Sequence, residues 1–298
     1  MRNNLGTNAH IPRTETLDKI KEGNISWVRM DFNWDLIEPE KGIFNFDYHD
    51  DAVTDCNMRE INVLGILAYT PKWANGDQDK SYLPLDYDDW IRYVHKVVHR
   101  YGSKVKHWEI WNEPNDHKFF KGTLKEYGEK ILAYASDTIR NISNDFRLDL
   151  KIVAPSINCN RTNWPVWLKE LEWYAKRKFF DISSIHLYRY PARDVIDGIE
   201  KGKSFAWLIP FRRPIRQYLD KIGLPCWITE TGWSTMHTTY EAQKNNYKRL
   251  LQYTTLYSTI DRVFFYEIMD DPNTPEKFGI LTDTYSEKPA YKFLKSLW

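Results

Sequence analysis

A glutamate at the end of an aromatic run is the first residue of this chain whose setting suggests chemistry. Glu113 follows the apolar, Trp-rich stretch His107–Trp111 and stands in the order Asn112-Glu113-Pro114. Proline cannot donate to a β-ladder and holds the preceding residue in an extended conformation, so the strand is predicted to end at the Glu113-Pro114 step. Glu113 is therefore predicted at a strand tip among aromatic rings, a setting suited to acid–base catalysis.

A second carboxyl, Glu230, ends another apolar run in the segment ITETGW, residues 228–233. Two carboxyls on opposite sides of a cleft cleave glycosidic bonds in one of two ways. At about 5–5.5 Å, one carboxyl attacks the anomeric carbon while the other acts as acid and then base, and the configuration is retained. At about 6.5–9.5 Å, a water molecule fits between them and the configuration inverts. The sequence leaves this distance open.

The elements around these glutamates predict a (β/α)₈ TIM barrel, formed as a single domain over residues 1–298. Short apolar runs alternate about eight times with longer amphipathic segments, which is typical of this fold. Strands are predicted at Leu5–Asn8, Ser26–Phe32, Asn62–Tyr69, His107–Trp111, Lys151–Pro155, Ile182–Tyr188, Pro225–Thr229 and Arg262–Ile268. Helices are predicted at Thr14–Gly23, Asp47–Arg59, Asp86–Tyr101, Leu124–Ile142, Trp164–Arg177, Phe205–Ile222, Tyr240–Thr259 and Lys288–Leu297. A doubly wound open sheet would alternate similarly, but no Gly-x-Gly-x-x-Gly follows the first strand.

In such a barrel the active site lies at the carboxyl ends of the strands. Polar and aromatic residues occur at every predicted strand end: Asn8, His10, Arg29, Asp31, Asn33, Trp34, Tyr69, Trp73, Asn112, Glu113, Asn158, His186, Tyr188, Glu230, Trp233, Tyr266 and Glu267. Trp73, Trp233 and Trp34 are candidates for stacking on sugar rings. Glu109, earlier in its strand, is expected to pair within the barrel, and Glu38 and Glu40 are expected on a solvated face.

Composition narrows the class of partner. The net charge is +1, which argues against a nucleic acid or an acidic membrane surface as a partner. Aromatic residues make up 15% of the chain, more than a core alone requires, and suit a ligand rich in hydroxyl groups. We expect a carbohydrate substrate, a monomer and no cofactor. We also expect no metal, because His95 and His99 lack the His-Glu-x-x-His pattern. No signal peptide is visible at the N-terminus, so a cytoplasmic protein or a secreted one with its signal removed is expected.

Together these motifs resemble glycoside hydrolase clan A, whose members are retaining (β/α)₈ enzymes. The segments Trp108–Asn115 and Thr70–Asn75 are most similar to family 39-like or family 5-like endoglycosidases. The resemblance implies that Glu113, on strand four, is the acid/base and that Glu230, on strand seven, is the nucleophile. It also implies that Arg29 supports the nucleophile.

Further site residues follow from the same resemblance. His186 and Tyr188 match the clan's His/Tyr position near the nucleophile, and Asn112 would bind the sugar 2-hydroxyl. Asn33 and Glu267 complete the expected substrate contacts. Two departures stand out: Phe265-Tyr266-Glu267 replaces the tryptophan common at the end of strand eight, and 298 residues leave no room for the β-sandwich domain of family 39 xylosidases.

The function expected is a retaining β-glycoside hydrolase, endo-acting on a polysaccharide. An exo-acting β-glycosidase on short oligosaccharides shares the chemistry and differs in the loops that wall one end of the cleft. Thr70–Leu85 and Lys201–Pro214, with Trp207 and Phe211, are the loops that would form this wall or carry further sugar subsites. A third alternative is a catalytically silent barrel that binds carbohydrate; the presence of both glutamates and Arg29 disfavours it.

Overall fold

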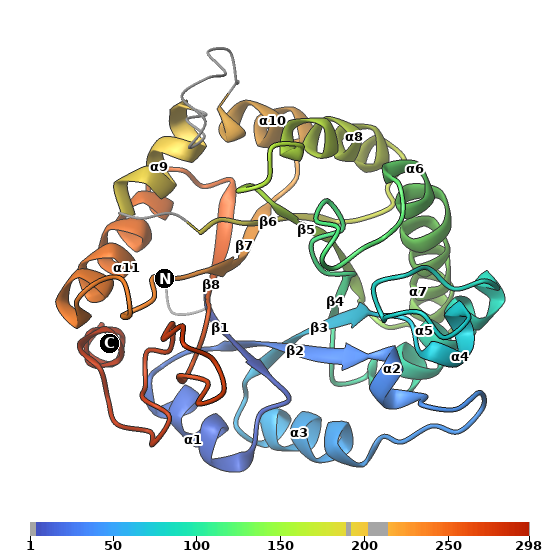
Figure 1. Cartoon of the computed structure of the whole chain (residues 1–298), viewed down its shortest axis with the longest axis horizontal. Coiled ribbons are helices and arrows are strands. Elements are labelled where there is room, and N and C mark those ends of the chain that lie inside the picture. Colours follow the sequence, from blue (N-terminus) through green and yellow to red (C-terminus); the bar gives the residue numbers. More distant parts are fainter. Residues whose placement is uncertain (1–3, 189–191, 202–213, 298) are drawn as a thin grey trace.

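The computed structural model describes residues 4–188, 192–201 and 214–297. Eight parallel strands follow one another in sequence order around a closed barrel, and helices surround them (Figure 1). Closure comes from β1, which pairs with both β2 and β8. The predicted (β/α)₈ barrel is therefore confirmed.

The strands are β1 Leu5–His10, β2 Trp27–Asn33, β3 Asn62–Ala68, β4 His107–Ile110, β5 Lys151–Asn158, β6 Ile182–His186, β7 Cys226–Thr231 and β8 Ile260–Phe265. The helices are α1 Thr14–Glu22, α2 Trp34–Ile37, α3 Asp47–Met58, α4 Lys72–Asn75, α5 Tyr87–Tyr101, α6 Leu124–Glu126, a π-helix Tyr127–Leu132, α7 Ala133–Asp145, α8 Trp164–Lys176, α9 Ala192–Lys201, α10 Ile215–Ile222, α11 Tyr240–Thr254 and α12 Pro289–Lys295.

Some boundaries differ from prediction. β5 continues past Pro155 to Asn158, and its pairing with β6 shifts register between Val153 and Ser156, the kind of irregularity at which a strand tolerates proline. β8 ends at Phe265, three residues before the predicted end. Helix α9 was not predicted, and residues 205–213 of the predicted helix Phe205–Ile222 lie outside the described residues.

The main hydrophobic core lies between the strands and the surrounding helices. A second, smaller cluster of buried residues lies inside the barrel. It consists of Trp27, Leu64, Val153, Ile182, Trp227 and Phe264. The Arg262 guanidinium lies 4.1 Å from the Trp27 ring centre and 4.8 Å from that of Trp227. Since Trp27 and Trp227 lie near the starts of β2 and β7, they help to close the amino end of the barrel and leave the carboxyl end for polar groups.

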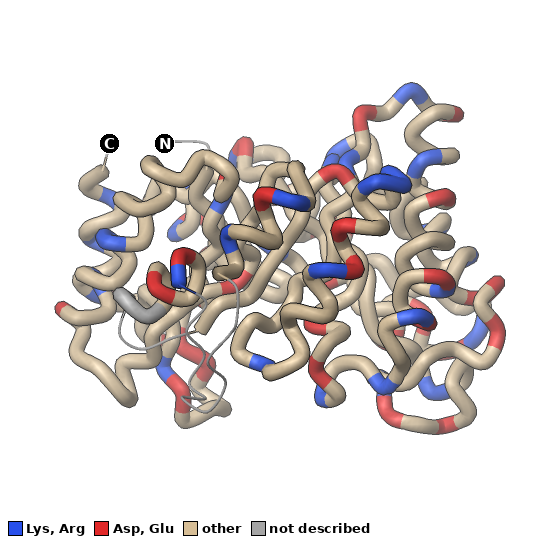
Figure 2. Tube along the Cα trace, turned by 90° about the horizontal axis from the view of Figure 1, so that it is seen from above, with Lys and Arg blue, Asp and Glu red and all other residues tan. Residues whose placement is uncertain are grey.

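Charged residues are interspersed along the outer helices and loops (Figure 2), in keeping with the net charge of +1. Among the described residues, no helix has the length and apolar character needed to cross a membrane.

Candidate active site

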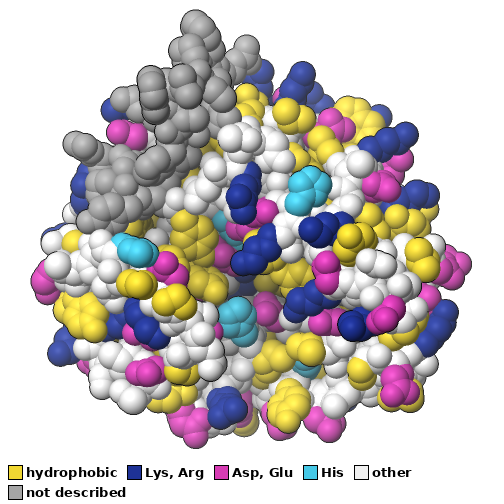
Figure 3. Space-filling model, in the orientation of Figure 1, with side chains coloured by type: hydrophobic (Ala, Val, Ile, Leu, Met, Phe, Trp, Pro, Cys, Tyr) yellow, Lys and Arg dark blue, Asp and Glu magenta, His cyan; other side chains and the backbone are white. Residues whose placement is uncertain are grey.

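A pocket of about 560 Å³ opens at the carboxyl end of the barrel. The surface is hollowed there, with acidic, histidine and apolar side chains around the hollow (Figure 3). The pocket is lined by Asn8, His10, Arg29, Asp31, Asn33, Ile66, Tyr69, Asn112, Glu113, Phe119, Glu230 and Tyr266. Both predicted catalytic glutamates therefore share one pocket.

The backbone after β4 turns Glu113 into this pocket. The strand ends at Ile110, earlier than the predicted Glu113-Pro114 step, because Trp111 has a φ of 70° that breaks the extended conformation. Asn112 pairs once more with Ser156, and Glu113 has a φ of 42°. Residues other than glycine rarely occupy this left-handed region, and they cluster at functional sites when they do.

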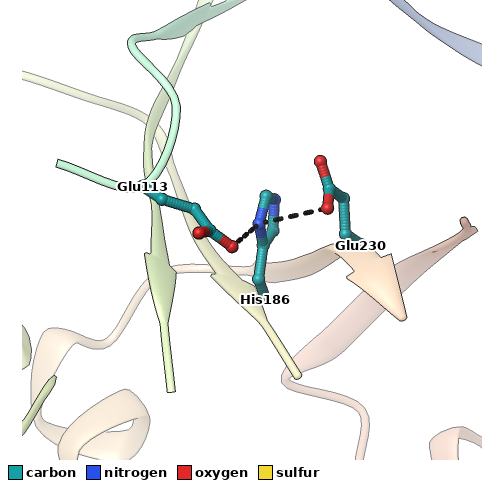
Figure 4. A group of neighbouring side chains, drawn as sticks. All are labelled: Glu113, His186 and Glu230. Carbon is teal, nitrogen blue, oxygen red and sulfur yellow. Dashed lines mark hydrogen bonds and ion pairs between the residues drawn. The ribbon is translucent and has the colours of Figure 1, made fainter. Parts of the chain in front are cut away.

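Glu113 and Glu230 approach each other across His186 (Figure 4). His186 Nδ1 lies 2.7 Å from Glu113 Oε1 and 3.5 Å from Glu230 Oε2. One carboxylate oxygen of each glutamate and one ring nitrogen of His186 all lie within 4.8 Å of one another. This close approach of the two carboxyls favours the retaining geometry over the inverting one.

The surroundings of Glu113 favour its neutral form. Its side chain is almost fully buried, and this burial raises its pKa to about 7, reinforced by the charge of Asp116. A hydrogen bond of 2.8 Å from Asn158 Nδ2 to Glu113 Oε2 opposes that rise. A carboxylic acid with a pKa near neutrality suits a general acid.

Glu230 lies in a different environment, among hydrogen-bond donors from β2 and from the segment just past β6. Arg29 Nη1 donates to Glu230 Oε1 at 2.5 Å, and the Tyr188 hydroxyl donates to Oε2 at 2.6 Å. Burial and the adjacent Glu230 charge raise the pKa of Tyr188 well above its usual value. The phenol therefore stays protonated and can donate this hydrogen bond. A carboxylate held in place by a guanidinium and a phenol is suited to act as a nucleophile.

Arg29 is itself fixed from several sides. Its Nε donates to Glu109 Oε2 at 2.7 Å, and Nη1 also donates to Asn8 Oδ1 at 2.9 Å. Glu109 is fully buried and accepts a further hydrogen bond from Ser184, as expected for a carboxyl that pairs within the barrel. The arginine is 3% exposed, so its charge acts within a site shielded from solvent.

His186 is fully buried, and this burial lowers its pKa to about 4. The ring is therefore neutral near neutral pH, with only one of its two nitrogens carrying a proton. Nε2 has no hydrogen-bond partner among the described residues. His186 thus positions the two glutamates without adding a positive charge between them.

Three further predicted residues, Asn112, Asn33 and Glu267, differ in their relation to the pocket. Asn112 lies on its wall, where Oδ1 accepts from Arg29 Nη2 at 3.0 Å, and Asn33 lines it as well. Glu267 is not among the pocket-lining residues, but its Oε2 lies 3.8 Å from Nε2 of His10, which lines the pocket. Burial raises the pKa of Glu267 to about 7.

Two of the predicted sugar-stacking tryptophans are buried. Trp233 is 2% exposed and packs edge-on against Tyr247 of α11, and Trp34 is fully buried beside Tyr93. Neither ring has a free face for a sugar, so those two predictions are wrong. Trp73 is half-buried, donates its indole N–H to Glu38 O at 2.8 Å and is not among the pocket-lining residues.

Glu38 also departs from its prediction. It is fully buried rather than solvated, and it accepts hydrogen bonds from the Trp34 indole and from Arg92 Nη2 at 2.7 and 2.6 Å. No sequence pattern indicates this pairing, because Arg92 lies on α5, far along the chain from Glu38.

Several site residues were noted at strand tips without an assigned role. Asn158 binds Glu113, Asn8 binds Arg29, and Tyr69 and Tyr266 line the pocket. His10 Nδ1 lies 2.9 Å from Asp31 Oδ2, and this contact raises the pKa of His10 to about 9. Phe119 was missed, since it lies in the loop after β4 and outside any strand pattern.

Within the described residues, Glu113, His186 and Glu230 form the one group of three side chains that could hold a metal ion. A cation there would meet the Arg29 guanidinium, which already contacts Glu230. The three side chains are explained without a metal, as the carboxyl pair and the histidine that contacts both carboxyls.

Comparison with known proteins identifies relatives of this arrangement. The family model described as Glycosyl hydrolases family 39 matches residues 16–242. A β-xylosidase of Caldicellulosiruptor saccharolyticus is 29% identical over 159 residues, which are 49% of this chain and 30% of that protein. A β-xylosidase of Geobacillus stearothermophilus is 28% identical over 164 residues, which are 50% of this chain and 31% of that protein. The match thus spans about a third of each curated relative.

Solved structures share the fold. A family 39 glycoside hydrolase from Bacteroides cellulosilyticus WH2 superposes with a TM-score of 0.73 and 19% identity, covering 99% of this chain and 63% of that one. A family 10 endo-β-1,4-xylanase from Gloeophyllum trabeum superposes with a TM-score of 0.68 and 14% identity, covering 98% of this chain and 95% of that one.

Proposed function

Because this chain belongs to glycosyl hydrolase family 39, we propose that it is a retaining β-glycoside hydrolase acting by double displacement. The observation that carries the proposal is the approach of the Glu113 and Glu230 carboxylate oxygens to within 4.8 Å. Their surroundings supply the division of labour that the mechanism needs. Burial favours the neutral form of Glu113, and Glu230 accepts hydrogen bonds from Arg29 and Tyr188.

In the first step, a Glu230 oxygen attacks the anomeric carbon while Glu113 transfers its proton to the glycosidic oxygen. The bond to the leaving sugar breaks, and a glycosyl ester remains on Glu230. In the second step, ionised Glu113 takes a proton from water, whose oxygen attacks the same carbon and releases Glu230. Each step inverts the configuration, so the product retains it.

The supporting residues act on these two carboxyls. Arg29 and Tyr188 orient the Glu230 carboxylate by hydrogen bonds, and His186 lies between the two carboxyls. Asn112 would donate to the sugar 2-hydroxyl, a contact that strengthens in the transition state. Glu267 would act on the substrate through His10, which faces the pocket.

The first site holds charged groups of both signs, because Arg29 and His10 line the same pocket as Asp31 and the two glutamates. The two relatives named β-xylosidase make β-linked xylose the first sugar to test. We propose endo action, with exo action on short oligosaccharides as the alternative that the test below separates.

The test is the hydrolysis of a polysaccharide panel that includes xylan, with product sizes read early in the reaction. Intermediate oligomers would support endo action, whereas release of monosaccharide alone would rule it out. Glu230→Ala is expected to lower kcat by roughly four orders of magnitude or more, as loss of a nucleophile does. Near-normal turnover by this variant would refute the mechanism. A silent binding barrel predicts instead that the wild-type chain binds sugar and hydrolyses none.

A further inference from the structure

A buried asparagine just past Glu113 joins the turn after β4 to the end of β5. Asn115 is 4% exposed. Its Oδ1 accepts from the Asn158 backbone N–H at 2.8 Å, and its Nδ2 donates to the Asn158 carbonyl oxygen at 3.0 Å. Nδ2 also donates to Asn163 Oδ1 at 3.1 Å. A side-chain amide has one oxygen and two N–H groups, so every polar group of this side chain is hydrogen-bonded to the segment 158–163.

The Asn115 amide takes the place of a neighbouring strand. A bridge between Asn112 and Ser156 carries the pairing of β4 and β5 toward the pocket, and the chain then turns at Glu113 with a φ of 42°. Past that turn, β4 has no backbone beside the last residue of β5, Asn158. The Asn115 side chain supplies the acceptor and the donor that a paired strand would otherwise give to Asn158.

Asn163 holds the same amide from the loop after β5. It stands at the N-cap position of α8, where an asparagine side chain usually accepts from the first helical turn, yet no such bond is present. Its Nδ2 donates instead to the Asn115 carbonyl oxygen at 2.9 Å, while its Oδ1 accepts from the Asn115 side chain. This reciprocal pair fixes the turn after Glu113 to the start of α8.

The link to the reaction runs through the side chain of Asn158. Asn158 Nδ2 donates to Glu113 Oε2 at 2.8 Å. A side chain follows its own backbone, so this donor stays within reach of Glu113 only while the backbone of Asn158 is held. Among the described residues, the hydrogen bonds of the Asn115 side chain go to Asn158 and Asn163 and to neither glutamate.

We propose that Asn115 is a positioning residue, which holds Asn158 in place and through it orients the carboxyl of the general acid. The inference rests on the proposed hydrolysis, in which Glu113 is that acid. It predicts that Asn115 matters most for substrates whose leaving group needs a proton, and that its effect disappears once the Asn158 side chain is removed.

The first test compares Asn115→Ala with the wild type on two substrates, the oligosaccharide of the panel that is hydrolysed fastest and an aryl glycoside of the same sugar. The value of kcat/KM reports the glycosylation step, in which the acid acts. A loss of about tenfold is expected on the oligosaccharide, the size of one hydrogen bond to a charged group. On an aryl glycoside whose leaving group needs no proton, little loss is expected. Equal losses on both substrates, or none on either, would overturn the role.

A double-mutant cycle tests the route through Asn158. Adding Asn115→Ala to Asn158→Ala should cost no further kcat/KM on the oligosaccharide, whereas additive losses would overturn the inference. Ser136→Ala is the structural control, because Ser136 is buried on α7 and donates to the Phe179 carbonyl oxygen at 2.8 Å, near the start of β6. It should lower the melting temperature and leave the ratio of the two kcat/KM values unchanged.

A ¹³C NMR titration of the Glu113 carboxyl separates this inference from the proposed hydrolysis, because it needs no turnover. The Asn158 donor lowers the pKa of Glu113, so Asn115→Ala should move the midpoint to higher pH, as Asn158→Ala should. The charged and titratable groups that face Glu113 are kept in both variants: Asp116, Arg161, Arg29, His186 and Glu230. A raised midpoint supports the role even if the wild type hydrolyses nothing. An unchanged midpoint in Asn115→Ala overturns it even if hydrolysis is normal.

Discussion

The proton on Glu113 sets the alkaline limit of the proposed reaction. Burial favours the neutral carboxyl and raises its pKa to about 7, with Asp116 adding to the rise and Asn158, Arg29 and Arg161 opposing it. A general acid works only when protonated, so kcat/KM is expected to fall as the pH rises through about 7. The measurement is a pH profile on an oligosaccharide substrate.

Glu113→Ala provides the control for that profile. On an aryl glycoside whose leaving group needs no proton, the variant should keep measurable glycosylation and lose the alkaline fall. If the fall persists in Glu113→Ala, another group causes it, and the assignment of Glu113 as the acid is wrong.

Asn158 is expected to position Glu113. Its Oδ1 accepts from the Asn160 backbone N–H at 3.0 Å, which leaves Nδ2 facing Glu113 Oε2. Asn158→Ala removes this donor, so the alkaline limb should move to higher pH and kcat/KM should fall about tenfold. Asn158→Asp places a like charge there and should move the limb further. Unchanged limbs in both variants, at unchanged melting temperature, would contradict this role.

At the scale of elements, the alternation of apolar runs sufficed to predict all eight strands, because each parallel strand is buried on both faces. Glu113 and Glu230 were predictable for the same reason: each stands where such a run meets a turn. The burial of Trp233 was not predictable, because it depends on packing against Tyr247 of α11, which lies further along the chain. Strand ends also escaped prediction where a bulge carries β5 through Pro155.

Gly6 shows how close packing at the β1–β8 seam depends on one residue. It pairs with Phe264 across the strands that close the barrel, and a Cβ on Gly6 would lie 2.3–2.8 Å from three atoms of that ring. The ring is fully buried and cannot move freely. Gly6→Ala is expected to destabilise the fold by about 1–3 kcal/mol, which thermal unfolding would measure.

A double mutant tests the cause of that loss. If the clash with the ring is responsible, Gly6→Ala combined with Phe264→Leu should cost less than the sum of the two single changes. Strict additivity would place the loss elsewhere, for example in the conformational freedom of the glycine backbone.

At the scale of the whole molecule, the C-terminal helix completes the outer layer. α12 lies beside α1, where Tyr291 donates to Lys19 O at 2.7 Å and Asn24 donates to Lys295 O at 3.3 Å. The barrel therefore joins its first and last helices as well as its first and last strands. The loops that carry Glu267 and its neighbours lie between β8 and this helix, so the helix anchors one wall of the site.

Lys288, at the start of α12, is the main polar anchor. Its ammonium donates to Asp270 Oδ1 and to Gly279 O, each at 2.8 Å, and its side chain is 1% exposed against 8% for Asp270. Lys288→Met leaves the Asp270 carboxylate buried without its partner. The expected loss is about 3–5 kcal/mol, seen as a lower melting temperature.

An exposed ion pair gives the matched control. Lys176 and Glu172 lie 2.8 Å apart on α8, with side chains 69% and 27% exposed. Lys176→Met should change stability by about 0–1 kcal/mol, because solvent already screens that pair. Adding Asp270→Asn to Lys288→Met should recover part of the loss, since no unpaired charge is left in the interior. Equal effects of Lys288→Met and Lys176→Met would mean that the buried pair does not anchor the C-terminal helix.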